Sequence, residues 1–292
     1  MKTRLKLITL AVTAITFAAC GSGSKTPGTD SVHIETIADG ITICNGMNGI
    51  EVIGIQDREG EQAVDLFRGS YDDSLLDSLL APGQTAFRSA FNVYIARGNA
   101  GNSNDINHTI LFDAGIGPQA GGQMLMRLSD QGIEPTDIEA VCLTHLHFDH
   151  LGWLLDSAGN VTFPNATLYL SKEEMSSSKD NERWQQVLTA YGEHVTTFSN
   201  GDTICYGMVT TMVVPGHTPG HTLYEVGPCL IVGDLLHAQD LQLEHPDFCA
   251  RYDADPARAV QVRKGILQKC DRLLCGAHCY DLFISISSDS HE

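Results

Sequence analysis

The sequence predicts an α/β domain in which short apolar strands alternate with helices. Its 292 residues suit one large domain of this class. Apolar runs of strand length recur along the chain, and four of them stop at a histidine or an aspartate. Before the last of these runs, Asp255 is expected to N-cap a helix that has Pro256 in its first turn and runs to about Lys269.

Residues 1–19 are expected to be an export signal and not part of the fold. Basic side chains precede an apolar run over residues 7–17, which is shorter than the roughly 20 residues that a membrane span needs. The small residues before Cys20 resemble a bacterial lipoprotein signal, in which the cysteine becomes the lipidated first residue of the mature chain. Phe17 is unusual in such a signal, so cleavage by ordinary signal peptidase is the alternative.

Residues 20–31 have the composition of a flexible tether, and they lead to a predicted folded domain over residues 32–292. The sequence thus predicts an exported lipoprotein, anchored to a membrane through a lipid on Cys20. Its location is expected to be the periplasm, the outer membrane or the cell surface.

The chain is strongly acidic, with a formal net charge of −18. Removal of the signal leaves 15 basic and 36 acidic residues, a net charge of −21. Such a surface repels nucleic-acid phosphates, so no nucleic-acid partner is expected.

The nine cysteines permit disulfides in an exported protein, but their spacing matches no small disulfide framework. No CxxC motif is present, so a thiolate zinc site has no support. Cys142 and Cys229 lie in apolar runs and are predicted to be small core residues.

The first half of the domain is predicted to begin with antiparallel strands. Glycine turns separate β-rich runs over residues 32–56. Residues 57–84 are polar and acidic, and we expect an insertion with one short helix, lying over the site or at a homodimer contact. Strands at 90–96 and 109–112 are predicted to follow, and then a helix over 121–131.

The second half is predicted to alternate strands and helices. A buried strand at 140–143 precedes a polar cluster and a helix near 151–155. Residues 172–191 are predicted to be mostly helical. Further strands are expected at 166–170, 208–214, 223–226, 230–232 and 273–277.

The polar cluster after the strand at 140–143 is the main functional signal. Three histidines and an aspartate lie within six positions, at His145, His147, Asp149 and His150. This composition packs poorly in a core, whereas neutral imidazole and carboxylate bind Zn²⁺ or Fe²⁺ well. Alternate side chains of a tight turn can face one point, so the first two histidines and the last two residues are expected to serve two neighbouring points.

Three other predicted strands end in residues of the same kind, at His217, Asp234 and His278. Strand ends in one layer often assemble a catalytic site. The resulting set of seven ligand-type side chains exceeds what one Zn²⁺ uses and suits two metals bridged by a carboxylate. We therefore expect two divalent cations, with zinc as the first choice and iron or manganese as alternatives, and with Asp234 between them.

With these motifs the chain resembles the metallo-β-lactamase fold superfamily. The resemblance covers about residues 32–285 and implies a four-layer αββα sandwich with the site at one edge of the paired sheets. It rests on four ordered motifs, which are HxHxDH at 145–150, GHTPGH at 216–221, Gly-Asp at 233–234, and His278. The ligands that it implies are His145, His147 and His217 for one metal, Asp149, His150 and His278 for the other, and Asp234 as the bridge.

Within the superfamily, three segments resemble the branch that contains N-acyl-homoserine lactonases and methyl-parathion-type hydrolases. They are Phe91-Asn92, residues 163–166 and residues 253–256. The lactonases carry a tyrosine three residues after the bridging aspartate, where this chain has His237. His237 is expected either to contact the substrate or to support the ligands, and Trp153, in place of a common glycine, is expected to narrow the pocket.

Other polar and aromatic residues are predicted to have supporting roles. His221 is expected to be a hydrogen-bond donor behind the ligands, and Asp113 a strand-end acceptor that orients the metal loop. Trp184 and Tyr191 are expected in the core. The remaining histidines are predicted to lie on the surface, at His33, His108, His194, His245 and His291.

The predicted reaction is hydrolysis of a small ester, lactone or phosphotriester by a hydroxide that bridges the metals. Paired cations about 3.5–4 Å apart lower the pKa of a shared water, and one polarises the attacked oxygen. Asp149 and Asp234 are expected to accept the water's proton, and a metal-bound water or His237 to protonate the leaving group. The alternative is a metal-dependent oxidoreductase of the same fold, similar to sulfur dioxygenases. The acidic net charge argues against a nuclease, and the complete ligand set argues against a non-catalytic lipoprotein.

Overall fold

The structure is a computed structural model that describes residues 15–16, 32–46, 49–99 and 107–286. The predicted export signal and tether lie outside the described residues, apart from the two residues of β1 (Ile15–Thr16), which pair with β2. No helix in the described part of the chain has the length and apolar character needed to cross a membrane.

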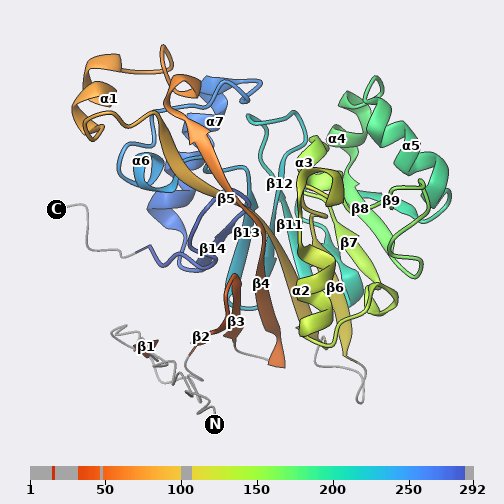
Figure 1. Ribbon diagram of the computed structural model, residues 1–292. Helices are drawn as coiled ribbons and strands as arrows, with labels where there is room; N and C mark the ends of the chain where they lie inside the picture. The colour runs from red at the N-terminus through yellow and green to blue at the C-terminus, as the bar shows by residue number, and fades with distance from the viewer. Residues whose placement is uncertain (1–14, 17–31, 47–48, 100–106, 287–292) are drawn as a thin grey trace, which may run out of the picture.

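Two mixed β-sheets face each other and carry helices on their outer faces (Figure 1). Within the described residues, the larger sheet has nine strands in sequence order and the smaller has five. The larger sheet contains β1, β2 (His33–Ala38), β3 (Ile41–Asn45), β4 (Glu51–Ala63), β5 (Ala86–Gly98), β6 (His108–Phe112), β7 (Ala140–Cys142), β8 (Thr167–Ser171) and β9 (Val195–Phe198). The smaller contains β10 (Thr203–Ile204), β11 (Val209–Val213), β12 (Thr222–Val226), β13 (Cys229–Gly233) and β14 (Leu273–Gly276).

Pairing is antiparallel from β1 to β6 and parallel from β6 to β9. The smaller sheet is antiparallel except for the parallel pair β13 and β14. The α-helices are α1 (Asp73–Leu79), α2 (Met124–Asp130), α3 (Phe148–Leu151), α4 (Lys172–Ser177), α5 (Glu182–Tyr191), α6 (Gln239–Glu244) and α7 (Pro256–Lys269). Short 3-10 turns lie at Val64–Leu66, Pro118–Ala120, Pro135–Asp137 and Cys205–Gly207.

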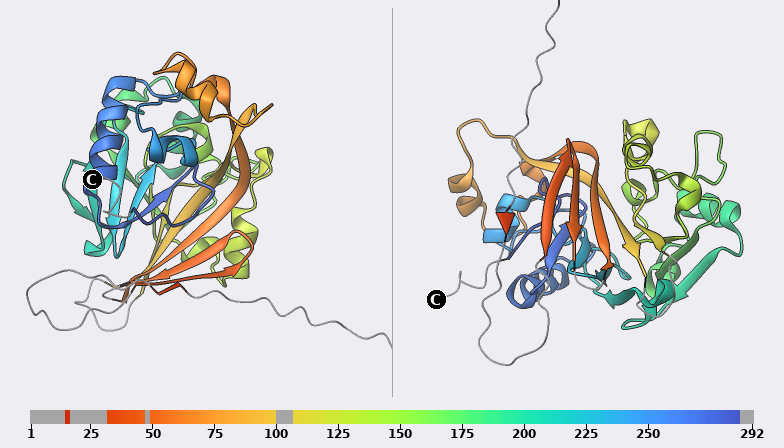
Figure 2. Two further views of the ribbon diagram at one scale, coloured as in Figure 1. Left: turned by 90° about the vertical axis from the view of Figure 1, so that its left-hand side faces the viewer. Right: turned by 90° about the horizontal axis from the view of Figure 1, so that it is seen from below.

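Side chains of the central strands alternate between two cores, as the pleat of a strand requires. On β5, Val93 packs in the core beneath α2 and α5, whereas Tyr94 packs between the sheets. On β13, Ile231 faces the other sheet and Val232 faces α7. The order is therefore helices, sheet, sheet and helix, as the left view of Figure 2 shows, and the predicted four-layer αββα sandwich is confirmed.

The insertion after β4 begins later than predicted. β4 continues to Ala63, and the single short helix of the segment is α1. Apolar residues of this segment, including Phe67 and Leu76, pack against Leu241 and Phe248 of the same chain. The insertion thereby forms one upper lobe of the molecule beside α6 (Figure 1).

The helix predicted near 151–155 is wrong in position, because α3 lies within the polar cluster and ends at Leu151. The backbone N–H groups of Gly152 and Trp153 donate to Gly115 and Ala114, so they are tied to the loop after β6 and do not extend a helix. The strands β9 and β10 were not predicted.

Helix α7 begins as predicted, since the Asp255 side chain accepts a hydrogen bond from the backbone of Arg258 and Pro256 lies in the first turn. Its inner face also buries Arg263, which the sequence did not predict. The predicted core residues Trp184, Tyr191, Cys142 and Cys229 are buried. The cysteines of the described residues are free, and the Sγ atoms of Cys142 and Cys205 lie 3.4 Å apart.

Candidate metal centre

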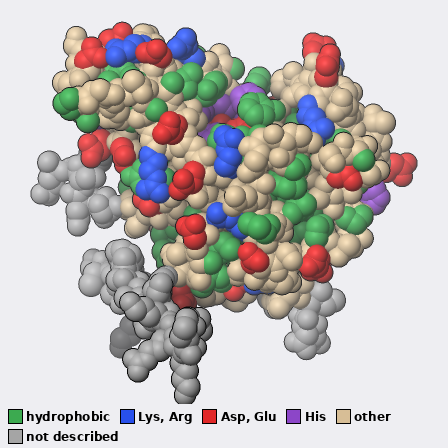
Figure 3. All heavy atoms as spheres, viewed as in Figure 1, with side chains coloured by type: hydrophobic (Ala, Val, Ile, Leu, Met, Phe, Trp, Pro, Cys, Tyr) green, Lys and Arg blue, Asp and Glu red, His purple; other side chains and the backbone are tan. Residues whose placement is uncertain are grey.

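Four loops that follow β7, β11, β13 and β14 gather at one edge of the paired sheets. Figure 3 shows histidine side chains beside an acidic one in the depression between the lobe of α1 and the lobe of α4 and α5. The structure brings together all of the predicted ligand residues, namely His145, His147, Asp149, His150, His217, Asp234 and His278.

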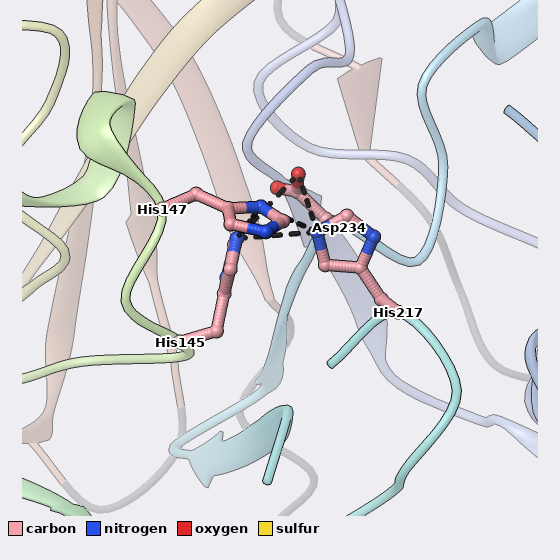
Figure 4. A group of neighbouring side chains, drawn as sticks. All are labelled: His145, His147, His217 and Asp234. Atoms are coloured by element: carbon pink, nitrogen blue, oxygen red, sulfur yellow. Dashed lines mark hydrogen bonds and ion pairs between the residues drawn. The ribbon is translucent and has the colours of Figure 1, made fainter. Parts of the chain in front are cut away.

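Three imidazoles converge on one point in the first half of the centre (Figure 4). Nδ1 of His147 lies 2.9 Å from Nε2 of His145 and 3.0 Å from Nε2 of His217. The two Nε2 atoms are 3.2 Å apart. Tetrahedral Zn²⁺ with nitrogen ligands at 2.0–2.1 Å requires nitrogen separations of about 3.3 Å. This triangle of nitrogens therefore fits one cation.

The protonation of two of these histidines also suits a cation. Burial, followed by the neighbouring His150, lowers the pKa of His145 well below its usual value. Burial and the adjacent His217 lower the pKa of His147 to about 4. Both rings are consequently neutral at pH 7 and present lone pairs. Burial lowers the pKa of His217 too, but Asp234 and Asp253 outweigh it and raise that pKa to about 9.

The second half of the centre is a mixed carboxylate and imidazole group. Oδ2 of Asp149 lies 3.4 Å from Nε2 of His278 and 3.9 Å from Nε2 of His150. Both histidines are buried, whereas the Asp149 side chain retains 12% exposure. Solvent therefore reaches this group at the Asp149 side chain.

Asp234 lies between the two halves. Its Oδ2 is 3.2 Å from Nε2 of His217, and its Oδ1 is 3.0 Å from Nε2 of His150. Nε2 of His150 and Oδ1 of Asp234 are buried, and neither has a hydrogen-bond partner among the described residues, which is costly unless a cation satisfies them. Burial raises the pKa of Asp234, but His278 and His150 outweigh burial and hold it well below its usual value.

Hydrogen bonds behind the ligands orient the rings. Nδ1 of His150 lies 2.8 Å from Oδ2 of Asp113, and Nδ1 of His217 lies 2.9 Å from Oδ1 of Asp253. Nδ1 of His278 lies 3.0 Å from the backbone oxygen of Ala90. When Nδ1–H donates to such an acceptor, the Nε2 lone pair points into the centre, as metal binding requires.

Asp113 also orients the loop that carries the ligands, as predicted. Its carboxylate accepts from the backbone N–H of Thr144 at 2.8 Å and from the Thr144 hydroxyl at 2.8 Å. His221 was expected to donate a hydrogen bond behind the ligands. This expectation is wrong, because its Nε2 accepts a hydrogen bond from the backbone N–H of Asp234 at 3.2 Å. Burial and His217 lower the pKa of His221 to about 3, which keeps that nitrogen free to accept.

His237 lies inside the centre. Its ring is fully buried, neither ring nitrogen has a hydrogen-bond partner among the described residues, and Nε2 lies 3.3 Å from Oδ2 of Asp234. The ring stacks on His278 at 5.5 Å and contacts Tyr252 at 5.7 Å between centroids. The expected narrowing of the pocket by Trp153 is not what the structure shows, because its indole N–H donates to buried Asp57 and the ring packs against the core.

Several supporting residues were not predicted from the sequence. Asp253 belongs to the segment 253–256 that resembles the lactonase branch, but nothing in the sequence indicates that it supports a ligand. Arg263 is buried in α7, where its Nη2 lies 3.4 Å from Asp253. Glu174 is buried at the start of α4. Among the predicted surface histidines, His194 is exposed, whereas His33, His108 and His245 are partly buried. His108 lies 2.7 Å from Glu139, and His291 lies outside the described residues.

Comparisons with known sequences agree with this arrangement. Residues 92–278 match the family model of the metallo-beta-lactamase superfamily. The N-acyl homoserine lactonase AttM of Azorhizobium caulinodans is 28% identical over an alignment of 178 residues, which covers 53% of this chain and 63% of that protein. A hydroxyacylglutathione hydrolase of Hamiltonella defensa is 29% identical over 157 residues, 53% of each chain. The chain thus spans between 53% and 63% of the length of these curated relatives.

Solved structures share the fold over most of their length. AidC, described as a dizinc quorum-quenching lactonase, superposes with a TM-score of 0.70 at 22% identity, over 84% of this chain and 93% of that one. The hydrolase AbOPH superposes with a TM-score of 0.72 at 24% identity, over 86% of this chain and 94% of that one. At these identities the likeness is one of fold.

Proposed function

Because the chain belongs to the metallo-beta-lactamase superfamily, we propose that it is a metal-dependent hydrolase with a dinuclear centre, acting on a small ester, lactone or phosphotriester. The observation that carries the proposal is the position of Asp234, whose carboxylate lies 3.2 Å from His217 of one ligand group and 3.0 Å from His150 of the other. One carboxylate within reach of two groups suits a bridged pair of cations.

Two divalent cations bound there would supply an activated water and a Lewis acid for the attacked carbonyl or phosphoryl oxygen. Zinc is the first choice because three imidazoles form the first group, and iron and manganese are the alternatives. Asp149 and Asp234 offset the positive charge. Asp149, the more exposed of the two, is placed to take a proton from water that enters the depression.

His237 is proposed to donate a hydrogen bond to an oxygen of the substrate. It is buried beside Asp234, and its ring nitrogens have no hydrogen-bond partner among the described residues. A neutral imidazole in this position can donate one N–H to a substrate oxygen. Burial lowers the pKa of His237, which keeps the ring neutral at pH 7.

An apolar group on the substrate would meet apolar protein surface near the centre. Phe148, between two ligand residues, is 69% exposed, and Tyr252, beside His237, is 48% exposed. The relatives named lactonases and hydroxyacylglutathione hydrolases support a carbonyl ester or thioester more directly than a phosphotriester.

The test is a His147→Ala variant, with His194→Ala as a control that removes an exposed histidine outside the centre. The expected result is loss of hydrolysis of chromogenic esters, lactones and phosphotriesters, together with a lower metal content by mass spectrometry. Full activity of His147→Ala would overturn the proposal. Oxygen consumption with bound iron, and no hydrolysis, would favour the oxidoreductase instead.

We also propose export as a lipoprotein through a lipid on Cys20. The support is the sequence of residues 1–20 alone. Labelling of cells with a fatty-acid probe tests it, since a Cys20→Ala variant should lose the label and the membrane association. A homodimer through the insertion around α1 stays a prediction, and light scattering of the purified domain measures it.

A further inference from the structure

Glu174 lies behind the first group of imidazoles and belongs to none of the sequence motifs. It occupies the first turn of α4, and only 2% of its surface is exposed. A buried carboxylate is costly unless hydrogen bonds satisfy its oxygens. Its partners therefore indicate what the residue does.

Three donors converge on the Glu174 carboxylate. The backbone N–H of Leu146 donates to Oε1 at 3.1 Å. The hydroxyl of Thr218 and the backbone N–H of Gly220 donate to Oε2 at 2.6 Å and 3.0 Å. Leu146 stands between His145 and His147, and Thr218 directly follows His217. One side chain therefore connects the two loops that carry the first three imidazoles.

Further contacts hold this connection in place. The hydroxyl of Ser171 donates to the backbone oxygen of Gly220 at 2.8 Å and accepts from the backbone N–H of Glu174 at 3.1 Å. A Cβ atom added at Gly220 would collide with the backbone nitrogen of Glu174, so only glycine permits this approach. Asn181 donates to the backbone oxygen of Leu146 at 2.8 Å, from the start of α5.

The second ligand group has a separate support. His150 is oriented by Asp113, and its backbone oxygen accepts from the backbone N–H of Ala114 at 2.8 Å. His278 is oriented by the backbone oxygen of Ala90. None of these contacts involves Glu174.

We propose that Glu174 is a positioning residue that sets the spacing of the two loops and thereby the affinity of the cation site formed by His145, His147 and His217. The inference rests on the proposed metal centre and is independent of the substrate. Glutamine cannot replace the carboxylate, because its amide nitrogen would face one of the backbone N–H donors and leave that donor unpaired. Burial raises the pKa of Glu174, and the three hydrogen bonds oppose that rise.

The test compares Glu174→Gln with Glu173→Gln, which makes the same change of charge at an exposed neighbour on the same helix. Each apoprotein is titrated with Zn²⁺ in competition with a chromophoric chelator. We expect Glu174→Gln to bind one of two equivalents about 10–100-fold more weakly, the usual effect of losing a hydrogen bond behind a ligand, and to bind the other normally. Glu173→Gln should match the wild type.

A His278→Ala background assigns the affected site, since the one remaining equivalent should weaken by the same factor when Glu174→Gln is added. Unchanged binding of both equivalents would overturn the inference. If the affinity of both equivalents falls equally, and the apoprotein unfolds at a lower urea concentration than the wild type, the inference is overturned in favour of a general structural role. If Glu174→Gln does not fold, Thr218→Val removes one of the three hydrogen bonds and should weaken the same equivalent to a lesser degree.

The result separates this inference from the proposed function. A wild-type protein that binds no Zn²⁺ overturns both. A wild-type protein that binds two equivalents, with a Glu174→Gln variant that does the same, overturns the role of Glu174 alone.

Discussion

Oδ1 of Asp234 lies 3.0 Å from Nε2 of His150, although Asp234 follows a strand of the smaller sheet and His150 follows one of the larger sheet. The same carboxylate reaches His217 at 3.2 Å through its other oxygen. At the edge where the two sheets meet, the Asp234 side chain therefore contacts residues of both ligand groups.

Replacement of Asp234 by asparagine should weaken both cation sites. The substitution keeps the shape of the side chain but removes the charge that faces both groups. His278→Ala, in contrast, removes a ligand of one group and should leave one equivalent bound. Metal stoichiometry after dialysis measures both variants, and two equivalents retained by Asp234→Asn would exclude the bridging role.

Asp113→Asn should weaken the site of His150 by about 10–100-fold. The carboxylate accepts from Nδ1 of His150 and from both donors of Thr144, and an amide can accept with one oxygen only. Competition titration with Zn²⁺ gives the affinity. Asp130→Asn at the exposed end of α2 is the control, and equal affinities of the two variants would contradict the expectation.

His237→Phe should keep the metal content and lower kcat by about 10²–10³-fold, the usual effect of losing one hydrogen-bond donor to developing negative charge. The loss should be largest for substrates with poor leaving groups, because the charge on their leaving oxygen depends most on that hydrogen bond. Rates for a series of aryl and alkyl esters measure the trend. Loss of bound metal in this variant would show that His237 is a ligand and not a hydrogen-bond donor to the substrate.

Arg263→Met should destabilise the protein by about 3–5 kcal/mol, because it removes the guanidinium beside buried Asp253 and leaves three backbone oxygens without their donor. The guanidinium donates to the backbone oxygens of Leu235, Pro246 and Phe248, at 2.8–2.9 Å, and pairs with Asp253. Urea unfolding measures the change. Arg258→Met on the exposed face of α7 should be close to neutral, and similar midpoints for both variants would refute the role of the buried cation.

Much of the architecture was predictable because it follows from local patterns. Alternating or continuous apolar runs predicted β5, β7, β13 and β14, and Asp255 with Pro256 predicted the start of α7. The pattern failed where tertiary hydrogen bonds override it. The apolar residues after His150 form a turn because their N–H groups bond to the loop after β6.

The ligand set of the centre was predictable from the sequence for a related reason. A strand that ends in histidine or aspartate can be recognised from a short stretch of sequence, and the ends of neighbouring strands meet at one edge of the fold. The supporting residues had no such signal. Glu174 and Arg263 are ordinary charged residues in sequence, and Asp253 lies in a segment that resembles relatives without showing what it contacts. Their roles arise from contacts with segments far away in the chain.

The sequence by itself determined the class of fold and the residues able to hold cations, because periodicity and strand-end chemistry are properties of short segments. Only the tertiary structure decided the distances within and between the two predicted groups, that His237 is buried beside Asp234, and which buried carboxylates orient the ligands. The physical reason is that burial and hydrogen-bond distance depend on packing between distant segments, as the reach of Glu174 to both imidazole loops illustrates.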